Sequence, residues 1–196
     1  MKEMRMELEQ CLARHCAPVF YGRKSANLIS VEKAEEAKLE MFLKETGVSW
    51  AVLCSCSQRS QILLYDRKRL EAYLAQEENR AFLVRCGYDA ETLEGKLQQL
   101  TVCYEAYRKQ GAEFPHEIGL FLEYPLADIL SYITHKGKYA IHNGYWKVYH
   151  NPDQAKERFQ LYDKLRDGLL ELLEEGHSLA ECVQKLQGNR LEPVFG

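Results

Sequence analysis

The segment Phe114–Asp153, FPHEIGLFLEYPLADILSYITHKGKYAIHNGYWKVYHNPD, carries most of the sequence signals that decide the fold. It holds four of the six histidines and the second of the two tryptophans. Its first apolar run, EIGLFLE (Glu117–Glu123), is short and rich in residues that favour strands. Runs of this kind are typical of buried strands, so a strand is predicted here.

A helix is predicted directly after Tyr124 and Pro125, because proline suits the first position of a helix, where its missing N–H costs nothing. Apolar residues follow at helical spacing, namely Leu126, Ile129, Leu130 and Ile133. Gly137 is suited to end the helix in a left-handed conformation. The run YWKVY (Tyr145–Tyr149) has strand composition, and Asn151-Pro152-Asp153 predicts the cap of the next helix. The segment therefore predicts a strand–helix–strand unit, with a right-handed crossover if its strands are parallel in one sheet.

Further elements are predicted on both sides of this segment. A helix over Lys2–Cys16 would end before Pro18, and the chain would then be irregular or partly extended up to Val31. Two apolar runs around a polar turn, Trp50–Cys56 and Gln61–Tyr65, predict an antiparallel hairpin that shares a sheet with Glu117–Leu122. The remaining predicted helices cover Glu32–Thr46, Arg67–Leu74 after an Asp66 cap, Glu77–Cys86, Asp89 to about Gln110, Gln154–Leu173, and Leu179–Leu186 with a Ser178/Glu181 capping box.

These elements predict an α+β fold in a single domain over residues 1–196, with a small mixed sheet of about four strands and about seven helices. The formal net charge of -3 speaks against a nucleic-acid partner. No apolar run reaches the ~18 residues of a membrane helix, and the charged start lacks a secretory signal. Seven cysteines, an odd number without disulfide-scaffold spacing, predict reduced thiols, no disulfide and a cytoplasmic location.

Several of these segments resemble one bacterial family, known as domain of unknown function (DUF) 3793. The most specific matches are HEIGLFLEYPLADILSYI and GYWKVYHNPDQAKERF, both in and after the segment quoted above. KSANLISV (Lys24–Val31) and QILLYDRKRLEAYL (Gln61–Leu74) are similar to two further family segments. The resemblance covers about residues 18–166, and helices over residues 152–187 would pack on that region. It implies a bacterial, anaerobe-type source and a context of iron and redox physiology, and it brings no activity.

The chain departs from the family pattern at two places. The family tends to have glycine at the position of Glu123, and cysteine where His142 and Asn143 stand. The second departure speaks against a thiol role for the loop before GYWKVY.

His116 and Glu117 are the first candidates for chemistry. A histidine beside a carboxylate suits acid–base catalysis, because the ordinary pKa of histidine lies near neutrality. The pair is not an H-E-x-x-H zinc motif, since Leu120 occupies the second histidine position. The alternative is a pair at a strand entry, with the His116 ring bound to a backbone carbonyl.

Two further sets of residues are candidates for ligand contacts. In an extended chain Tyr145, Lys147 and Tyr149 share one face, so Lys147 would contact an anion between two rings; the alternative is a solvated face opposite a core of Trp146 and Val148. Residues 24–27, KSAN, are predicted to form a loop ahead of a strand. In this loop Lys24 would meet a phosphate or carboxylate, whereas Asn27 would contact the ligand or cap a turn.

Metal and cofactor motifs receive less support. The segment holds four histidines whose spacing matches no standard zinc site, namely His116, His135, His142 and His150. Haem binding, with a histidine or tyrosine as axial ligand, is a less favoured alternative. Cys54 and Cys56 would share a strand face, but two buried, inert thiols are the favoured interpretation. The chain contains no glycine-rich phosphate loop, so the cofactor stays unknown and no metal ligand is assigned.

Two hypotheses follow. In the first, the protein has a small-molecule or anion site and is either a binding protein or an enzyme, with His116 and Glu117 as catalytic residues. The ligand-binding residues would then be Lys24, Asn27, Tyr124, Asp128, Tyr145 and Lys147. In the second, it is a non-catalytic accessory or adaptor protein whose amphipathic helices dock a protein partner. A concave pocket that joins Lys24, His116 and Lys147 favours the first, and an exposed apolar patch favours the second.

Overall fold

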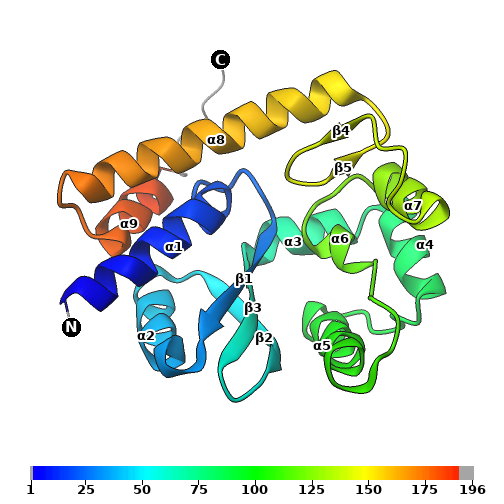
Figure 1. The fold of residues 1–196 in the computed structure, drawn as a ribbon, viewed down its shortest axis with the longest axis horizontal. Coiled ribbons are helices and arrows are strands. Elements are labelled where there is room, and N and C mark those ends of the chain that lie inside the picture. Colours follow the sequence, from blue (N-terminus) through cyan, green and yellow to red (C-terminus); the bar gives the residue numbers. More distant parts are fainter. Residues whose placement is uncertain (1, 190–196) are drawn as a thin grey trace.

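The computed structural model describes residues 2–189, and the side chains of residues 8–186. Residues 1 and 190–196, which the predicted domain includes, lie outside the described residues. In the described range a three-stranded antiparallel sheet lies between two groups of helices (Figure 1). The sheet order is β1-β3-β2, with β1 at Ala26–Glu32, β2 at Ser49–Ser55 and β3 at Arg59–Tyr65. The predicted α+β class is confirmed, although the sheet is antiparallel and not mixed.

The predicted hairpin between the two apolar runs is confirmed. Strands β2 and β3 pair antiparallel, with Trp50 opposite Leu64 and a register shift between Val52 and Cys54. Strand β3 is central, and its run from Ile62 to Tyr65 is buried on both faces of the sheet. This double burial explains why the run is continuously apolar and does not alternate.

The third strand of this sheet is β1, and the prediction that Glu117–Leu122 would pair with the hairpin is wrong. The segment forms a short buried helix instead, α6 at Ile118–Phe121. Its backbone groups find partners nearby, since the N–H of Leu122 donates to the Ile118 carbonyl and that of Tyr124 to the Gly119 carbonyl. A short apolar run fits a buried helical turn as well as a strand, and these local hydrogen bonds decide for the helix.

The second half of the predicted strand–helix–strand unit is also corrected. Only Lys147–Val148 of the YWKVY run is a strand, β5, and it pairs antiparallel with β4 at His142–Asn143. This two-stranded ribbon is separate from the main sheet, so the predicted crossover within this segment does not exist, and every described strand pair is antiparallel. The run cannot continue as a strand because the next two backbone N–H groups, of Tyr149 and His150, donate to a side chain of α7.

Two helix boundaries differ from the prediction. Helix α1, Lys2–Phe20, contains Pro18 and does not end before it. Proline normally interrupts a helix, but here it lies in the last turn, where the burial of Ala17 and Phe20 in the core holds the chain helical. Helix α5, Leu93–Gln110, starts after Thr92, whose hydroxyl accepts the N–H of Gly95, and not after Asp89.

The other helices agree with the sequence pattern. They are η1 at Lys33–Glu35, α2 at Glu36–Thr46, α3 at Arg67–Leu74, α4 at Glu77–Arg85, α7 at Leu126–His135, α8 at Pro152–Glu174 and α9 at Leu179–Asn189. Gly47 ends α2 in a left-handed conformation and Asp66 caps α3. Ser178 and Glu181 form the predicted capping box of α9.

The core has three parts. One apolar cluster joins α1, α2, α9 and the end of α8 to one face of the sheet, and a second joins the opposite face to helices α3 to α7. A third, smaller cluster packs the β4–β5 ribbon on the start of α8, with Trp146 and Phe159 at its centre. Helix α8 therefore spans the molecule, as Figure 1 shows, and connects the ribbon to α1.

Candidate functional site

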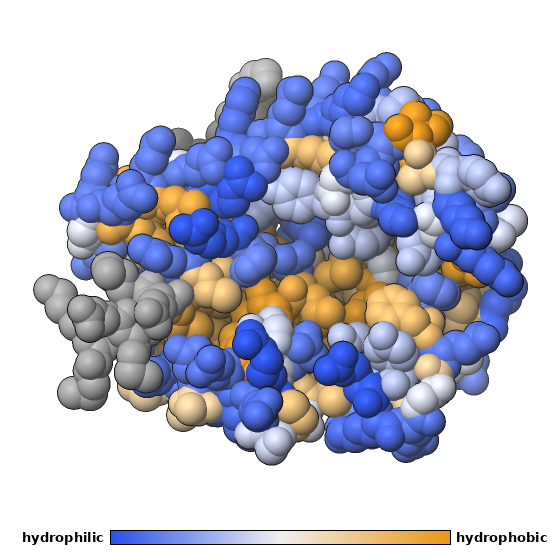
Figure 2. Space-filling view, viewed as in Figure 1, coloured by the Kyte–Doolittle hydropathy of each residue, from blue (hydrophilic) through white to orange (hydrophobic). Residues whose placement is uncertain are grey.

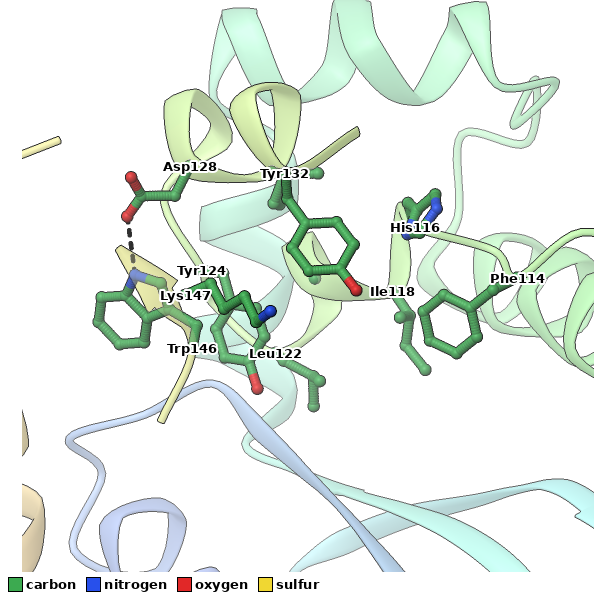
Figure 3. Close-up of a pocket in the computed structure, with 11 residues that line it drawn as sticks. Phe114, His116, Ile118, Leu122, Tyr124, Asp128, Tyr132, Trp146 and Lys147 are labelled. Atoms are coloured by element: carbon green, nitrogen blue, oxygen red, sulfur yellow. Dashed lines mark hydrogen bonds between the residues drawn. The ribbon is translucent and has the colours of Figure 1, made fainter. Parts of the chain in front are cut away.

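An open pocket of about 270 Å³ lies between α6, α7 and β5. Four of the residues proposed from the sequence line it: His116, Tyr124, Asp128 and Lys147. The rest of its lining is Phe114, Ile118, Gly119, Leu122, Ile129, Tyr132 and Trp146. The close-up in Figure 3 shows these side chains around an open space. Figure 2, viewed from the same direction as Figure 1, shows a face of the molecule that is hollowed across its middle, with apolar residues exposed between polar rims.

A tight turn between α6 and α7 builds the inner wall of the pocket. A Cβ atom at Gly119 would lie 2.9 Å from the Cδ1 atom of Ile129, so only glycine lets the two helices approach this closely. Between them Glu123 has a φ of 59°, a left-handed conformation that glycine adopts most readily. The turn aims the ring of Tyr124 into the pocket and starts α7 after Pro125.

Asp128 on α7 holds the ribbon that forms the outer wall. Its buried carboxylate accepts the indole N–H of Trp146 at 2.7 Å and the backbone N–H groups of Tyr149 and His150 at 2.9 Å each. Both carboxylate oxygens therefore have donors from the chain itself. Asp128 fixes the position of Trp146, and both oxygens of Asp128 already accept hydrogen bonds from the protein.

Trp146 is a packed wall of the pocket and only 7% exposed. Its ring centre lies 5.4 Å from that of Tyr124 and 4.5 Å from that of Phe159 on α8. A Cβ atom at Gly144 would lie 2.2 Å from Phe159, so the ribbon can sit on α8 only with glycine there. The indole is thus held by a hydrogen bond to Asp128 and by ring contacts with Tyr124 and Phe159. These contacts fix its position next to Lys147.

Lys147 lies at the rim of the pocket and is exposed. Its ammonium donates to the carbonyl of Gly137 at 2.7 Å and lies 5.8 Å from the ring centre of Tyr132. An ammonium has three donors, and one is used here. The remaining donors can meet an anion that enters from solvent.

His116 lies at another side of the same pocket and is half-buried. Its ring centre is 5.3 Å from those of both Phe114 and Tyr132. Among the described residues its ring nitrogens have no hydrogen-bond partner. Figure 3 shows Tyr132 between His116 and Lys147, with its hydroxyl directed into the space between Lys147 and Phe114.

Glu117 and Tyr145 do not line this pocket. The carboxylate of Glu117 accepts the hydroxyl of Tyr88 at 3.0 Å, and burial, followed by the charge of Glu117, raises the pKa of Tyr88. The structure therefore does not bring Glu117 to His116. The hydroxyl of Tyr145 donates to Asp163 on α8 at 3.0 Å, and burial raises the pKa of Tyr145 to about 12.

Lys24 and Asn27 lie behind the pocket, on the other side of Tyr124. Lys24 is 2% exposed; its ammonium donates to the Asn27 side chain at 2.7 Å and lies 5.5 Å from the Tyr124 ring centre and 5.9 Å from that of Tyr162. Burial lowers the pKa of Lys24 to about 8, against the opposing effect of Cys16 and Glu123. The amide of Asn27 in turn donates to the carbonyl of His15 at 2.6 Å.

Sequence reasoning missed an ion pair behind the turn, in which Glu123 is buried and Arg69 is partly exposed. The carboxylate of Glu123 accepts both the N–H and the hydroxyl of Ser25, and two guanidinium N–H groups of Arg69 on α3. Burial alone would raise the pKa of Glu123, but the hydrogen bonds from Arg69 and Ser25 outweigh it and lower this pKa. No local pattern could reveal this pair, because its members are 54 and 98 residues apart.

Two further residues of the pocket were not singled out from the sequence. Tyr132 follows Asp128 by four residues on α7, so helical periodicity places both on one face and would have found it. Phe114 lies two residues before His116, and its inward position depends on the loop between α5 and α6.

The described residues contain no cluster of three or more potential metal ligands. The four histidines of the segment point to different neighbours: His135 stacks on Tyr149, His142 on Phe159, and His150 bonds to the hydroxyl of Ser131. Cys54 is buried, but the expectation of a second buried thiol at Cys56 is wrong. The strand ends at Ser55, and hydrogen bonds from the backbone of Arg59 first and Gln58 second lower the pKa of the exposed Cys56 thiol.

Fold and site together define an α+β protein with an aromatic pocket held between two helices and a short ribbon. A family model described as "Protein of unknown function (DUF3793)" matches residues 12–183, and the chain belongs to this family. Neither the curated proteins nor the solved structures gave a match. In the described part of the chain no helix is both long enough and apolar enough to cross a membrane.

Proposed function

We propose that this protein binds a small molecule with a flat, apolar body and an anionic group, in the pocket between α6, α7 and β5. The observation that carries the proposal is the ammonium of Lys147 at the rim of a pocket lined mainly by aromatic and aliphatic side chains. Binding sites for small molecules commonly combine such a lining with a few polar groups that set the orientation of the ligand.

The size of the pocket limits the ligand. Its volume of about 270 Å³ exceeds the roughly 150 Å³ of a dry apolar cavity that holds benzene. One aromatic ring with substituents therefore fits, whereas a large cofactor does not. The rings of Phe114, Tyr124, Tyr132 and Trp146 in the lining favour a planar ligand, because aromatic rings attract each other in offset or edge-to-face arrangements.

The charges in the lining favour an anion over a cation. Asp128 is the acidic residue of the lining, and its oxygens already accept three hydrogen bonds. Lys147 has donors to spare, so the charge that an incoming ligand meets is positive. A carboxylate bound by Lys147 would lie next to the Tyr132 ring and the open mouth of the pocket.

Calorimetric titration with three matched probes tests the proposal. We expect benzoate to bind more tightly than the neutral benzamide, and benzylamine to bind least. Lys147→Met should remove the preference for benzoate, whereas the control Lys138→Met, at an exposed lysine outside the pocket lining, should leave it unchanged. Absence of binding by all three probes, or unchanged benzoate binding in Lys147→Met, would contradict the proposal.

Exposed apolar residues next to α7 support a second candidate, the adaptor. Tyr139 is 82% exposed and Ile141 is 63% exposed, and Leu130 and Ile133 of α7 are also partly exposed. A partner protein with a complementary apolar surface would cover them. A photo-crosslinking side chain at position 141 should then give one dominant adduct in the native cells. A control at Val84, an exposed position on α4, should not give it, and equal labelling from both positions would refute the adaptor.

We also propose that the protein works in the reducing cytosol. The support is that all seven cysteines are free, including the exposed Cys56 with its lowered pKa. A reactive exposed thiol survives best where cellular reductants keep it reduced. Titration of the denatured protein, purified without reductant, should count seven reactive thiols, and a shortfall that reductant restores would argue against this location.

A further inference from the structure

The pocket has polar groups on two sides and an apolar floor between them. Lys147 and His116 lie on different sides of the Tyr132 ring (Figure 3), with the ammonium 5.8 Å and the imidazole centre 5.3 Å from the centre of that ring. Apart from Asp128 and the hydroxyl groups of Tyr124 and Tyr132, the rest of the lining is apolar, and it includes Ile118, Leu122 and Ile129. A ligand that uses both polar groups must therefore be polar at both ends and apolar in the middle.

We infer that the ligand is a single-ring aromatic carboxylate that carries a hydroxyl group at the end opposite the carboxylate. The carboxylate binds Lys147 and the hydroxyl binds His116. This inference rests on the proposed function and names the ligand class of the same pocket.

The length of the ligand follows from the two distances to Tyr132. Together they limit the separation of the Lys147 ammonium and the His116 ring centre to about 11 Å. The imidazole nitrogens lie about 1 Å from the ring centre, so hydrogen bonds of about 2.8 Å at each end limit the polar atoms of the ligand to a separation of at most about 6 to 7 Å. The carboxylate and the para hydroxyl of one benzene ring lie within this upper limit, whereas the same groups on two rings in line exceed it.

The partner of His116 is a neutral group for two reasons. First, its ring nitrogens have no hydrogen-bond partner among the described residues, and an imidazole can both donate and accept. Second, the rings of Phe114 and Tyr132 flank it, and the neighbouring carboxylate of Glu117 is turned to Tyr88. A second carboxylate at this end would lose its hydration without meeting a fixed positive charge, which is costly, whereas a hydroxyl needs only one hydrogen bond.

The experiment measures the gain from the second polar group. Affinities of benzoate, phenol and 4-hydroxybenzoate are determined by titration for the wild type, His116→Phe and Lys147→Met. Phenylalanine keeps the ring that packs on Phe114 and Tyr132 and removes only the nitrogens. For the wild type we expect 4-hydroxybenzoate to bind about five- to tenfold more tightly than benzoate, as one added hydrogen bond provides. In His116→Phe this gain in affinity should vanish, so that 4-hydroxybenzoate and benzoate bind to this variant about equally.

The outcomes separate this inference from the proposed function. If benzoate binds in a Lys147-dependent way but the hydroxyl adds nothing, or its gain persists in His116→Phe, the ligand class is wrong and the proposed site stands. If no probe binds, both fail. Should His116→Phe not fold, the wild type alone still decides: 4-hydroxybenzoate must bind more tightly than its 2- and 3-hydroxy isomers, and equal affinities of the three would overturn the inference.

Discussion

Tyr124 separates two regions that use the same residue types in different ways. Behind it, the ammonium of Lys24 lies 5.5 Å from the Tyr124 ring centre and is buried with Asn27 and Tyr162. In front of it, the ammonium of Lys147 lies 5.8 Å from another tyrosine ring but at the rim of an open pocket. Both lysines make one hydrogen bond to the chain, and their main difference is access to water.

This difference assigns the two regions different roles. The buried charge of Lys24 is costly, as the lowered pKa shows, so this residue affects the stability of the fold. Lys147 keeps its hydration and its free donors, so its removal costs little stability and instead removes a contact for ligands. The following variants test this assignment of roles, beginning with Trp146 in the packed wall of the pocket.

Trp146→Ala should have the largest effect. Truncation of a buried tryptophan leaves a cavity and costs about 3–5 kcal/mol of unfolding free energy. Here it also leaves Asp128 without its shortest hydrogen bond. Urea unfolding monitored by circular dichroism measures the loss, and Tyr139→Ala, at a residue that is 82% exposed, is the control and should change little. A loss below about 1 kcal/mol would show that the wall is not packed as described.

Asp128→Asn should be the next most destabilising change, by roughly 2–3 kcal/mol, because the neutral amide replaces a carboxylate that accepts three N–H groups and turns one donor toward them. The matched control is Asp153→Asn in the first turn of α8, whose side chain is 94% exposed and which should lose only a few tenths of a kcal/mol. If both variants unfold at the same urea concentration, Asp128 does not hold the ribbon.

The buried charge of Lys24 should appear as a pH dependence. The pKa of Lys24 is about 8 in the folded protein, against 10.5 for an ordinary lysine, so between these values the unfolded chain binds more protons. The unfolding free energy of the wild type should therefore rise with pH relative to Lys24→Met, by on the order of 2 kcal/mol between pH 8 and pH 10. The cost of the charge is fully present below about pH 8. Urea unfolding of both proteins across this range measures the difference, and a difference that stays constant or falls would contradict the buried ammonium.

Lys147→Met should have the smallest effect on stability, below about 0.5 kcal/mol, since the residue is exposed and loses a single hydrogen bond to Gly137. The same variant should lower benzoate affinity about tenfold, as the loss of one hydrogen bond to a charged group predicts. Thermal unfolding and titration on the same samples measure both. A large loss of stability would show that Lys147, like Lys24, has a structural role.

Much of the candidate site could be located from the sequence, but the directions of its side chains could not. His116, Tyr124, Asp128 and Lys147 were placed in one segment, and the structure brings them to one pocket. The carboxylate of Glu117 turns to Tyr88 because Glu117 lies in the turn that starts α6, and not in the strand that the sequence predicted. Lys24 packs against Tyr162 and Tyr145 binds Asp163, and no local pattern encodes these two contacts with α8.

Signals within a few residues determined much of the fold by themselves. The apolar runs around a polar turn determined the β2–β3 hairpin, Gly47 the end of α2, and Ser178 with Glu181 the start of α9. Each depends on backbone geometry or on a hydrogen bond that closes inside its own segment. The hydrogen bonds that define these features need no partner from a distant segment.

The tertiary structure alone decided which strand completes the sheet and how the walls of the pocket come together. Ala26–Glu32 pairs with the central strand, while the apolar run at Ile118–Phe121, equally suited to a strand, coils between α5 and α7. The outer wall of the pocket is held because Asp128 binds the backbone of a ribbon about twenty residues further along the chain. The turn of the inner wall is held because Glu123 binds Ser25 and Arg69, which are distant in the sequence. The physical reason is that burial is shared among distant segments, so the partner of each buried polar group exists only once the whole chain has packed.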